Sequence, residues 1–382
     1  MNFVAKTFLG LEEVLEQELQ KLGAKNINKE RRAVSFSGDM KLMYRANLSL
    51  RTASRVLKII HTFNAKDADE IYAAVKKINW EDYMSVNQTI SIDSTVYSDT
   101  FRHSQFVSYR IKDAIADYFS EKYEKRPSVR LTNPDVMINI HIAQNRCTLS
   151  LDSSGDSLHK RGYRVGNTQA PINEALAAGM LLLAGWEGQS DFYDPMCGSG
   201  TLLVEAALIA LNIPPGLFRK SFQFEKWNDF DRELFDNLYN DDSMEREFKF
   251  KIYGSDLSPN AVSTATDNIK SAGVNRYVEV KKCSIANFEP ASDAGLIVTN
   301  PPYGERLKEE DLLGFYSQIG QTFKHRCNGK SAWVICSNVE YLQNMGLKPA
   351  RKIKLMNGEL PCEYWKFELF AGKRKEFLQG SR

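Results

Sequence analysis

The residues of this chain with the clearest chemical potential form the run Asn300-Pro301-Pro302-Tyr303, which follows the apolar stretch 296–298. Such a stretch is typical of a buried strand, and the two prolines should end it as a rigid, extended turn. The side-chain oxygen of Asn300 and the carbonyl oxygen of Pro301 could then accept hydrogen bonds from an exocyclic NH2 group. The ring of Tyr303 could stack on a flat base. The alternative is a purely structural turn with a buried tyrosine.

A second candidate site is a glycine-rich turn between a short predicted strand and a predicted helix. Its candidate ligand-binding residues are Asp194, Met196, Cys197, Gly198, Ser199, Gly200 and Thr201. Gly198 and Gly200 allow a tight turn and the close approach of a ligand. The helix that begins at Thr201 would direct its N-terminal amides at this turn. The turn matches neither the dinucleotide-binding fingerprint nor the phosphate-binding loop, and by itself it could be structural.

Asp256 ends the next predicted strand and is followed by Leu257 and a helix. A carboxylate at such a strand end can accept two hydrogen bonds from a ribose diol. As an alternative, Asp256 or Ser258 could cap the following helix. The spacing from the glycine-rich turn exceeds the usual distance of about 20 residues, and an insertion at 212–247 accounts for the difference. Asp194 and Asp256, each at a strand end, together favour a cofactor that contains a nucleoside.

A polar segment at 154–170 combines basic residues with an aromatic ring. Lys160, Arg161 and Arg164 flank Tyr163, which is a combination suited to a phosphate backbone and a base. A solvated linker whose arginines pair with nearby acids explains the same pattern equally well. The charge distribution is compatible with nucleic-acid contact in the front half. Residues 1–165 hold 25 Lys and Arg against 20 Asp and Glu, whereas the remainder holds 25 against 28.

The composition excludes several classes of protein. The chain has 382 residues, of which 43% are hydrophobic and 26% are charged, as in ordinary globular proteins. Its six cysteines are scattered without a CxxC pair, so we expect neither a metal site nor a disulfide framework. No signal layout is found at the N-terminus and no apolar run approaches the ~20 residues of a membrane helix. We therefore expect a cytoplasmic protein without membrane contact.

The pattern of predicted strands and helices divides the chain into four parts. Residues 1–63 and 64–153 each mix strands and helices as a small α+β unit does, and 154–170 is the basic linker. From 171 to 382 strands and helices alternate and end in a strand pair, which predicts an α/β fold with a doubly wound sheet. The insertion at 212–247 interrupts this rhythm, and we expect its aromatic residues to lie in a core.

At these motifs the chain resembles a known class of enzyme. Asp194–Thr201, Asp256 and Asn300–Tyr303 resemble the first, second and fourth motifs of class I methyltransferases that depend on S-adenosyl-L-methionine and act on exocyclic amines. The strings at 299–307, 154–164 and 170–174 resemble more narrowly the bacterial 23S rRNA guanine-N2 methyltransferases with an N-terminal THUMP RNA-binding domain. The resemblance covers essentially the whole chain and is weaker within residues 1–150.

The resemblance implies a C-terminal Rossmann-like, seven-stranded class I methyltransferase domain preceded by a ferredoxin-like unit and a THUMP domain. It implies S-adenosyl-L-methionine as cofactor, held by Asp194, residues 196–201, Asp256, Leu257, Ser284, Ile285 and Asn300. The family commonly has an acidic residue for the adenine amine at the end of the third strand. Here Ser284 or a backbone group takes that position.

The same resemblance assigns catalysis to Asn300–Tyr303 and RNA contact to the linker residues, and we expect Glu305 and Arg306 to shape the base pocket. The transfer would be in line and would depend mainly on orientation, with no strong general base. RNA is the expected partner, with rRNA favoured and tRNA an alternative. Two rival functions are an adenine-N6 DNA methyltransferase and a non-catalytic RNA-binding or ribosome-assembly protein. Oligomeric state is not predicted.

Overall fold

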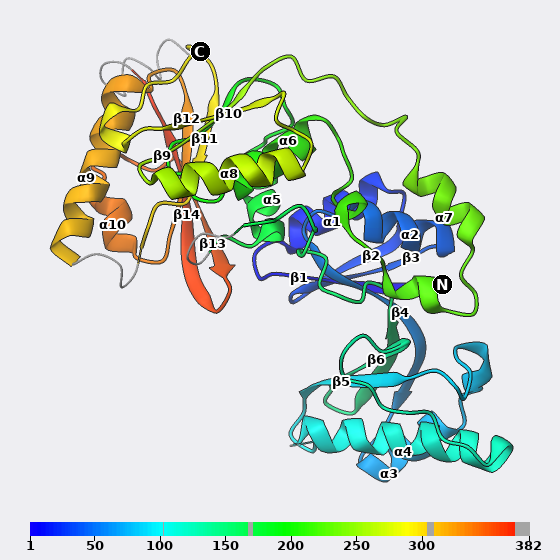
Figure 1. Cartoon of the computed structure of the whole chain (residues 1–382). Coiled ribbons are helices and arrows are strands. Elements are labelled where there is room, and N and C mark those ends of the chain that lie inside the picture. The colour runs from blue at the N-terminus through cyan, green and yellow to red at the C-terminus, as the bar shows by residue number, and fades with distance from the viewer. Residues whose placement is uncertain (102, 167–170, 304–308, 371–382) are drawn as a thin grey trace. The chain divides into compact units, whose positions relative to one another are not determined.

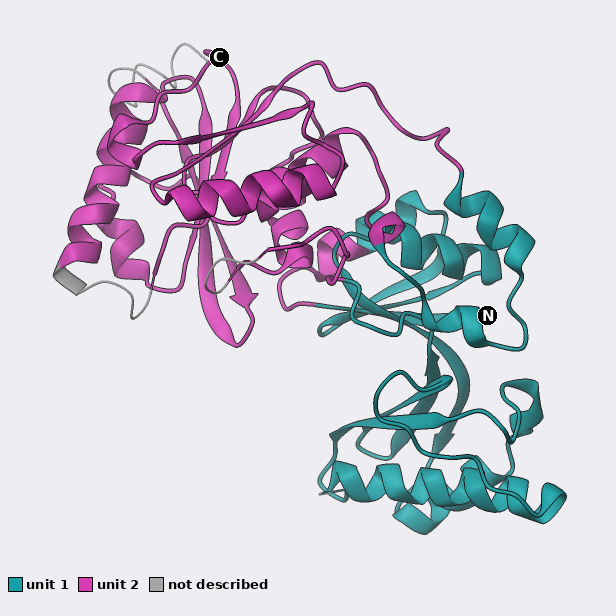
Figure 2. Cartoon of the chain, in the orientation of Figure 1, with its two compact units in different colours: residues 1–7, 16–158, 219–240 teal, residues 8–15, 159–218, 241–382 magenta. Residues whose placement is uncertain are grey.

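The computed structural model describes residues 1–101, 103–166, 171–303 and 309–370. Figure 2 shows two compact units, each of which contains more than one segment of the chain. Unit 1 comprises Met1–Thr7, Glu16–Leu158 and Arg219–Asn240. Unit 2 comprises Phe8–Leu15, His159–Phe218 and the described residues from Asp241 onward.

Unit 1 is built on one seven-stranded sheet with the strand order β2-β3-β1-β4-β7-β6-β5 (Figure 1). The strands are β1 (Asn2–Thr7), β2 (Lys25–Glu30), β3 (Ala33–Ser37), β4 (Ala53–Asn64), β5 (Ile90–Tyr97), β6 (Val136–Ala143) and β7 (Arg146–Asp152). The helices are α1 (Glu12–Lys21), whose first residues belong to unit 2, α2 (Met40–Ser49), α3 (Ala68–Lys76), α4 (Ser104–Tyr123) and α7 (Arg232–Tyr239), with short 3-10 turns at Trp80–Asp82 and Gln223–Lys226.

The strand β4 joins the two parts of unit 1 that the sequence separates at residues 63 and 64. It is 12 residues long and pairs with β1 on one side and with β7 on the other, both antiparallel. The neighbouring strand β1 buries Phe3, Ala5 and Thr7 on one face, as alternation requires. The ferredoxin-like and THUMP-like parts therefore share one continuous sheet.

Residues 219–240 lie in unit 1, whereas the sequence assigned the insertion at 212–247 to the C-terminal domain. The ring of Phe224 lies 4.6 Å from that of Tyr44 in α2, and the amide of Asp231 donates to the Tyr44 hydroxyl at 3.0 Å. The Lys58 ammonium pairs with Asp229 at 2.7 Å. The expectation of a core position is met by Phe222, Phe224 and Trp227, which are all buried, although the core is that of unit 1.

Unit 2 contains a second seven-stranded sheet, with the order β10-β9-β8-β11-β12-β14-β13. The strands are β8 (Phe192–Asp194), β9 (Ile252–Asp256), β10 (Val278–Lys282), β11 (Leu296–Thr299), β12 (Ser331–Cys336), β13 (Arg351–Asn357) and β14 (Leu360–Glu368). The helices are α5 (Glu174–Leu183), α6 (Thr201–Ala210), α8 (Pro259–Ser271), α9 (Glu309–Arg326) and α10 (Val339–Asn344), with 3-10 turns η2 (Pro215–Phe218) and η4 (Ile285–Asn287).

The first five strands of this order are parallel, and the terminal pair β14 and β13 runs antiparallel. Helices α5, α6 and α8 cover one face of the sheet, and α9 and α10 cover the other (Figure 1). The alternating side chains of β11 supply both cores, because Leu296 and Val298 face one and Ile297 the other. The predicted doubly wound α/β sheet with a terminal strand pair is confirmed. None of the described helices is long and apolar enough to cross a membrane.

Candidate active site

The topology of unit 2 brings the candidate residues to one edge of the sheet. Strand β8 lies between β9 and β11, and the chain direction of the parallel strands is the same. Asp194, Asp256 and Asn300 therefore stand at or just beyond three adjacent carboxyl ends. The strand order reverses between β8 and β11, and ligands of open α/β sheets bind in the crevice at such a point.

Asp194 is almost completely buried and holds two of these strand ends together. Its Oδ1 accepts a hydrogen bond from the Thr299 hydroxyl at 2.7 Å and one from the Met196 amide at 3.2 Å. Burial raises the pKa of Asp194 to about 7, and the negative charge of Asp256 acts in the same direction, whereas both hydrogen bonds oppose the rise. The carboxyl group is therefore poised to change its charge near neutral pH.

The glycine-rich turn is fixed to β9 by backbone hydrogen bonds. Gly198 and Gly200 have φ angles of 53° and 80°, in the left-handed region that glycine tolerates best. The Gly198 amide donates to Asp256 Oδ2 at 2.9 Å, and the Cys197 amide donates to the Ser255 carbonyl at 2.9 Å. Burial raises the pKa of the Cys197 thiol well above its ordinary value, so this cysteine is not an activated nucleophile.

Asp256 retains capacity for a ligand. From the described residues, its Oδ1 accepts the Ser258 amide at 2.9 Å and its Oδ2 accepts the Gly198 amide. A carboxylate has about four acceptor positions, so about two remain for the hydroxyls of a ribose. Of the two residues that could cap the following helix, Ser258 is the N-cap of α8, because its side chain accepts the capping hydrogen bond. Leu257 beside it is 67% exposed and can cover the apolar face of a ligand.

The end of β10 carries no acidic side chain, as the sequence indicates. The Cys283 amide donates to the Asp256 carbonyl at 3.0 Å, which fixes the course of the chain beyond the strand. Ser284 precedes η4 and its side chain makes no capping hydrogen bond. Ile285 is buried. A half-buried hydroxyl next to an apolar side chain suits the amine and ring of an adenine.

Asn300 has an incomplete hydrogen-bond arrangement. Among the described residues, its Oδ1 is buried and has no hydrogen-bond partner. A buried acceptor without a partner costs about 1–3 kcal/mol, and such atoms are rare in folded proteins. Within the described part of the chain, the oxygen is therefore open to an N–H donor such as that of a bound amine. The Tyr316 hydroxyl donates to the Pro302 carbonyl of the same turn at 3.4 Å, and Pro301 is buried.

Tyr303 is held at its hydroxyl. The Asn357 side-chain amide, at the end of β13, donates to the Tyr303 hydroxyl at 2.7 Å. The ring packs against both cores of unit 2, and burial raises the pKa of the phenol. The side chain is thus partly structural, with its ring orientation set by Asn357. Glu305 and Arg306 lie outside the described residues.

The burial and contacts of the linker residues differ from the expectation. Arg161 and Tyr163 are buried and both bond to Glu205 of α6, the guanidinium Nε at 3.4 Å and the phenol at 3.0 Å. The Arg164 guanidinium donates to Glu174 Oε1 at 2.9 Å. The prediction that Arg161 and Tyr163 contact RNA is therefore wrong, because both side chains are used inside unit 2. Arg164 is also largely enclosed, whereas Lys160 is exposed.

Three residues of the site had no role in the sequence analysis. These are Thr299, which bonds to Asp194; Asn357, which bonds to Tyr303; and Asn268 of α8, which contacts the glycine-rich turn. Asn268 could have been found, because it shares the inward face of its helix with Ala261 and Ala265 and a polar residue there needs buried partners. The side chain of Asn357 left no comparable signal.

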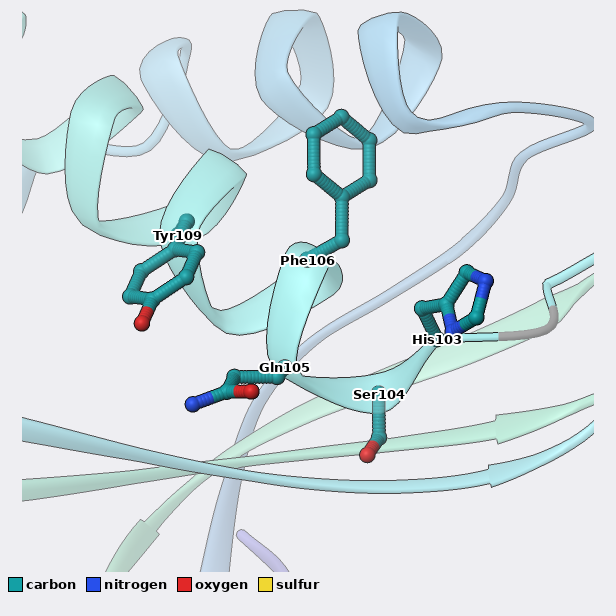
Figure 3. Close-up of a pocket in the computed structure, with 5 residues that line it drawn as sticks. All are labelled: His103, Ser104, Gln105, Phe106 and Tyr109. Atoms are coloured by element: carbon teal, nitrogen blue, oxygen red, sulfur yellow. The ribbon is translucent and has the colours of Figure 1, made fainter.

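A separate hollow of about 430 Å³ lies at the start of α4 in unit 1 (Figure 3). It is lined by His103, Ser104, Gln105, Phe106 and Tyr109. The rings of Phe106 and Tyr109 are 55% and 53% exposed. Exposed rings beside polar side chains are suited to stacking on unpaired bases. In the described part of the chain no group of acidic, histidine or cysteine side chains could hold a metal ion, and all six cysteines are free.

Comparison with family models divides the chain into three matched regions. Residues 161–366 match the model described as the RMKL-like methyltransferase domain. Residues 65–152 match the THUMP domain, and residues 2–57 match the RlmL ferredoxin-like domain.

Curated relatives extend over the whole chain. A putative RNA methyltransferase from Synechocystis is 40% identical over 371 residues, which cover 96% of this chain and 97% of the relative. The ribosomal RNA large subunit methyltransferase K/L of Syntrophotalea carbinolica is 38% identical over 382 residues, with 97% of this chain and 54% of the relative covered. The chain thus spans about half the length of the K/L relatives.

Solved structures match both units together. A putative methyltransferase in complex with SAH matches with a TM-score of 0.87 and 29% identity, and covers 97% of this chain and 99% of that chain. A protein from Listeria monocytogenes, described as a predicted N6-adenine-specific DNA methylase, matches with a TM-score of 0.87 and 31% identity over 96% of each chain. TrmN from Thermus thermophilus, at 16% identity and a TM-score of 0.72, shares the fold.

Proposed function

The chain belongs to the RMKL-like methyltransferase family, an S-adenosyl-L-methionine-dependent class, and we propose that it methylates the exocyclic N2 amine of a guanine in RNA. The favoured substrate is 23S rRNA, in keeping with the name of the K/L relatives. The observation that carries the proposal is the buried Oδ1 of Asn300, which has no hydrogen-bond partner among the described residues and lies at the same sheet edge as Asp194 and Asp256. It supplies an acceptor for an amine next to residues suited to the methyl donor.

The residues at the sheet edge fit the cofactor. Asp256 would hold the ribose hydroxyls, and the turn at 197–200 would surround the methionine part. Ser284 and Ile285 would contact the adenine in place of the usual acidic residue. When bound, S-adenosyl-L-methionine supplies an electrophilic methyl group. The chain itself contributes a fixed cradle, so that little reorganisation accompanies the reaction.

At the base, Asn300 and Pro301 would act together. The exocyclic amine of guanine is a poor nucleophile, because its lone pair is delocalised into the ring. The Asn300 Oδ1 and the Pro301 carbonyl oxygen would accept its two N–H groups and stabilise the positive charge that develops on nitrogen. The ring of Tyr303, with its hydroxyl held by Asn357, would position the base. No general base is needed before attack, since the proton can leave afterwards.

Unit 1 would bind the RNA. We propose that Phe106 and Tyr109, at the hollow shown in Figure 3, stack on unpaired bases of a structured RNA. A target base in a helix would have to leave the stack to reach Asn300. The proposed location is the cytoplasm, where ribosomal RNA is modified in bacteria. A tRNA substrate is the alternative within the same chemistry.

An adenine-N6 DNA methyltransferase is the second candidate function. The Listeria monocytogenes structure carries that description, and Asn-Pro-Pro-Tyr can serve either amine. The THUMP match at residues 65–152 favours RNA.

The test compares modified nucleosides in rRNA from cells with and without the gene. We expect one N2-methylguanosine to disappear from 23S rRNA and to return with the wild-type gene but not with Asn300→Ala. Purified protein with labelled donor is then offered 23S rRNA, tRNA and duplex DNA. Unchanged N2-methylguanosine together with transfer to DNA would overturn the proposal in favour of the second candidate.

The raised pKa of Asp194 predicts a pH-dependent affinity for the cofactor. A cationic ligand favours the ionised carboxylate, so binding below about pH 7 should release a proton and affinity should rise as the pH increases through about 7. In the protein without ligand, folding stability changes with pH in the opposite direction to cofactor affinity. The folded-state pKa lies above the unfolded value, so ionisation lowers stability as the pH rises from about 4 to about 7.

Calorimetry of S-adenosyl-L-methionine binding in the absence of RNA, between pH 5.5 and 8.5 and in buffers with different ionisation enthalpies, measures the released protons. Asp194→Asn is the control, and we expect it to bind more weakly and without this pH dependence. A wild-type affinity that is constant over this range, with no proton release, would contradict the prediction.

A further inference from the structure

Residues 161–166 form a short segment, here called the strap. It is bonded to Thr201 and, through Asn268, to the glycine-rich turn at 197–200, here called the donor turn. We propose that the strap and Asn268 of α8 are positioning elements that hold this turn in the shape that binds the methyl donor. The inference rests on the proposed function, because it takes the turn to be part of the donor site. It gives the basic linker a role other than RNA contact.

Asn268 connects three segments with one side chain. It is 1% exposed. Its Nδ2 donates to the Ser199 carbonyl at 2.9 Å and to the Gly166 carbonyl at 3.0 Å. Its Oδ1 accepts from the amides of Val165 at 2.9 Å and Gly166 at 3.1 Å. An asparagine side chain has two donors and two acceptor positions, and here all four are used. The donor turn is thus bonded to α8 and to the strap through one residue.

Arg164 fixes the strap to the start of α6. Its Nη2 donates to the Thr201 hydroxyl at 3.0 Å and to the Ile172 carbonyl at 3.1 Å. Its Nε donates to Glu174 of α5, and the side chains of Arg164 and Glu174 are 13% and 9% exposed. Thr201 is the first residue after the turn, so the guanidinium sets where the turn meets the helix.

Arg161 and Tyr163 anchor the other end of the strap on Glu205, one helical turn beyond Thr201. Glu205 is the one charged residue in the otherwise apolar or hydroxyl-bearing sequence of α6 and is fully buried. Taking the charges of Arg161 and Glu205 out of water costs free energy that apolar side chains in the same place would not cost. The buried pair therefore contributes little net stability. Its geometry instead fixes the direction of the strap across α6.

The two sides of the donor turn are therefore held by different groups. Asp256 binds the Gly198 amide on one side, and Asn268 binds the Ser199 carbonyl on the other. Two glycines with positive φ give this turn many alternative shapes. If only a fraction of molecules has the binding shape, the apparent affinity is the intrinsic affinity multiplied by that fraction. Fixing the turn before binding removes this loss.

The test is the affinity of the full chain for S-adenosylhomocysteine, measured by calorimetry at 25 °C. Asn268→Asp keeps the shape and the acceptors but loses both donors, so we expect Kd to rise about tenfold or more, with the KM for RNA unchanged. Thr266→Val is the matched control, because the Thr266 hydroxyl bonds to the Val262 carbonyl within the same helix. We expect its Kd to stay within about twofold of wild type.

Thermal unfolding of the same variants separates positioning from general stability. A lowered Tm for Asn268→Asp with unchanged Kd would overturn the proposal. If that variant does not fold, the pair Arg164→Lys and Thr201→Val replaces it. We expect each single change to raise Kd and the double change to raise it no further, because Arg164 acts through Thr201. Additive effects would overturn the proposal.

This readout is independent of the nucleic acid. If RNA were not the substrate, donor binding by the wild type and its loss in Asn268→Asp would be unaffected. Failure of the wild type to bind S-adenosylhomocysteine would instead remove the proposed function itself.

Discussion

Replacement of Asn300 by alanine is expected to lower kcat for RNA methylation by about 100-fold or more, because a fixed acceptor for the reacting amine is lost. The affinity for S-adenosylhomocysteine should fall much less than kcat, because Asn300 is one of several residues expected to hold the cofactor, whereas its bond to the amine is made mainly in the transition state. The free protein should unfold at an unchanged or higher temperature. Its Oδ1 is buried without a partner among the described residues, so the truncation removes an unsatisfied group rather than a hydrogen bond.

The matched control is Asn338→Ala. Asn338 follows the neighbouring strand β12 and caps α10 by accepting from the Glu340 amide at 2.9 Å. Its loss should cost about 1 kcal/mol of stability and leave kcat unchanged. Single-turnover kinetics and thermal unfolding of both variants measure the two effects. A normal kcat in Asn300→Ala would exclude the amide as the acceptor for the amine.

Replacement of Asp256 by alanine is expected to raise the Kd for S-adenosylhomocysteine about 100-fold or more. The change removes two charge-assisted hydrogen bonds to the ribose and also releases the Gly198 amide. Asp256→Asn keeps one acceptor oxygen, so its Kd should lie between those of alanine and wild type.

Ser258→Ala is the control for Asp256. Its hydroxyl caps α8 at the same strand end and lies two residues away. We expect it to lower Tm and to leave Kd within about threefold of wild type. Calorimetry and thermal unfolding distinguish the two positions. If Ser258→Ala weakened binding as much as Asp256→Ala does, the strand end would act through helix capping and not through the ribose.

The alternation of strands and helices in the C-terminal half could be predicted from sequence because it depends on local pattern. Apolar runs ending at Asp194 and Thr299 are visible without a structure, and so is the turn with two glycines between β8 and α6. The parallel order then follows from the rules of the fold. The sheet edge that collects Asp194, Asp256 and Asn300 was predictable for this reason.

Elements without apolar periodicity were missed. The strand β2 exposes nearly all of its residues and lies at the edge of its sheet, next to β3, so it has no inward face to reveal it. The helix α7 buries only Phe235. Both elements are defined by neighbours that the local sequence does not contain.

The linker was misinterpreted because its partners are distant in sequence. Cations beside a tyrosine are typical of a nucleic-acid surface, but Glu205 lies 42 residues beyond Tyr163. A single glutamate within the apolar run of α6 was the available signal, since a buried charge requires a partner. The contribution of Asn268 likewise depends on the packing of α8 against the turn.

The assignment of residues 219–240 to unit 1 has a consequence for synthesis on the ribosome. Unit 1 begins at the first residue, yet Phe224 and Phe235, which pack on Tyr44, emerge only after residues 159–218 of unit 2. Because translation proceeds at about 5–20 residues per second, the nascent unit 1 waits several seconds with Tyr44 uncovered. A gene fragment that stops at residue 158 therefore encodes an incomplete fold.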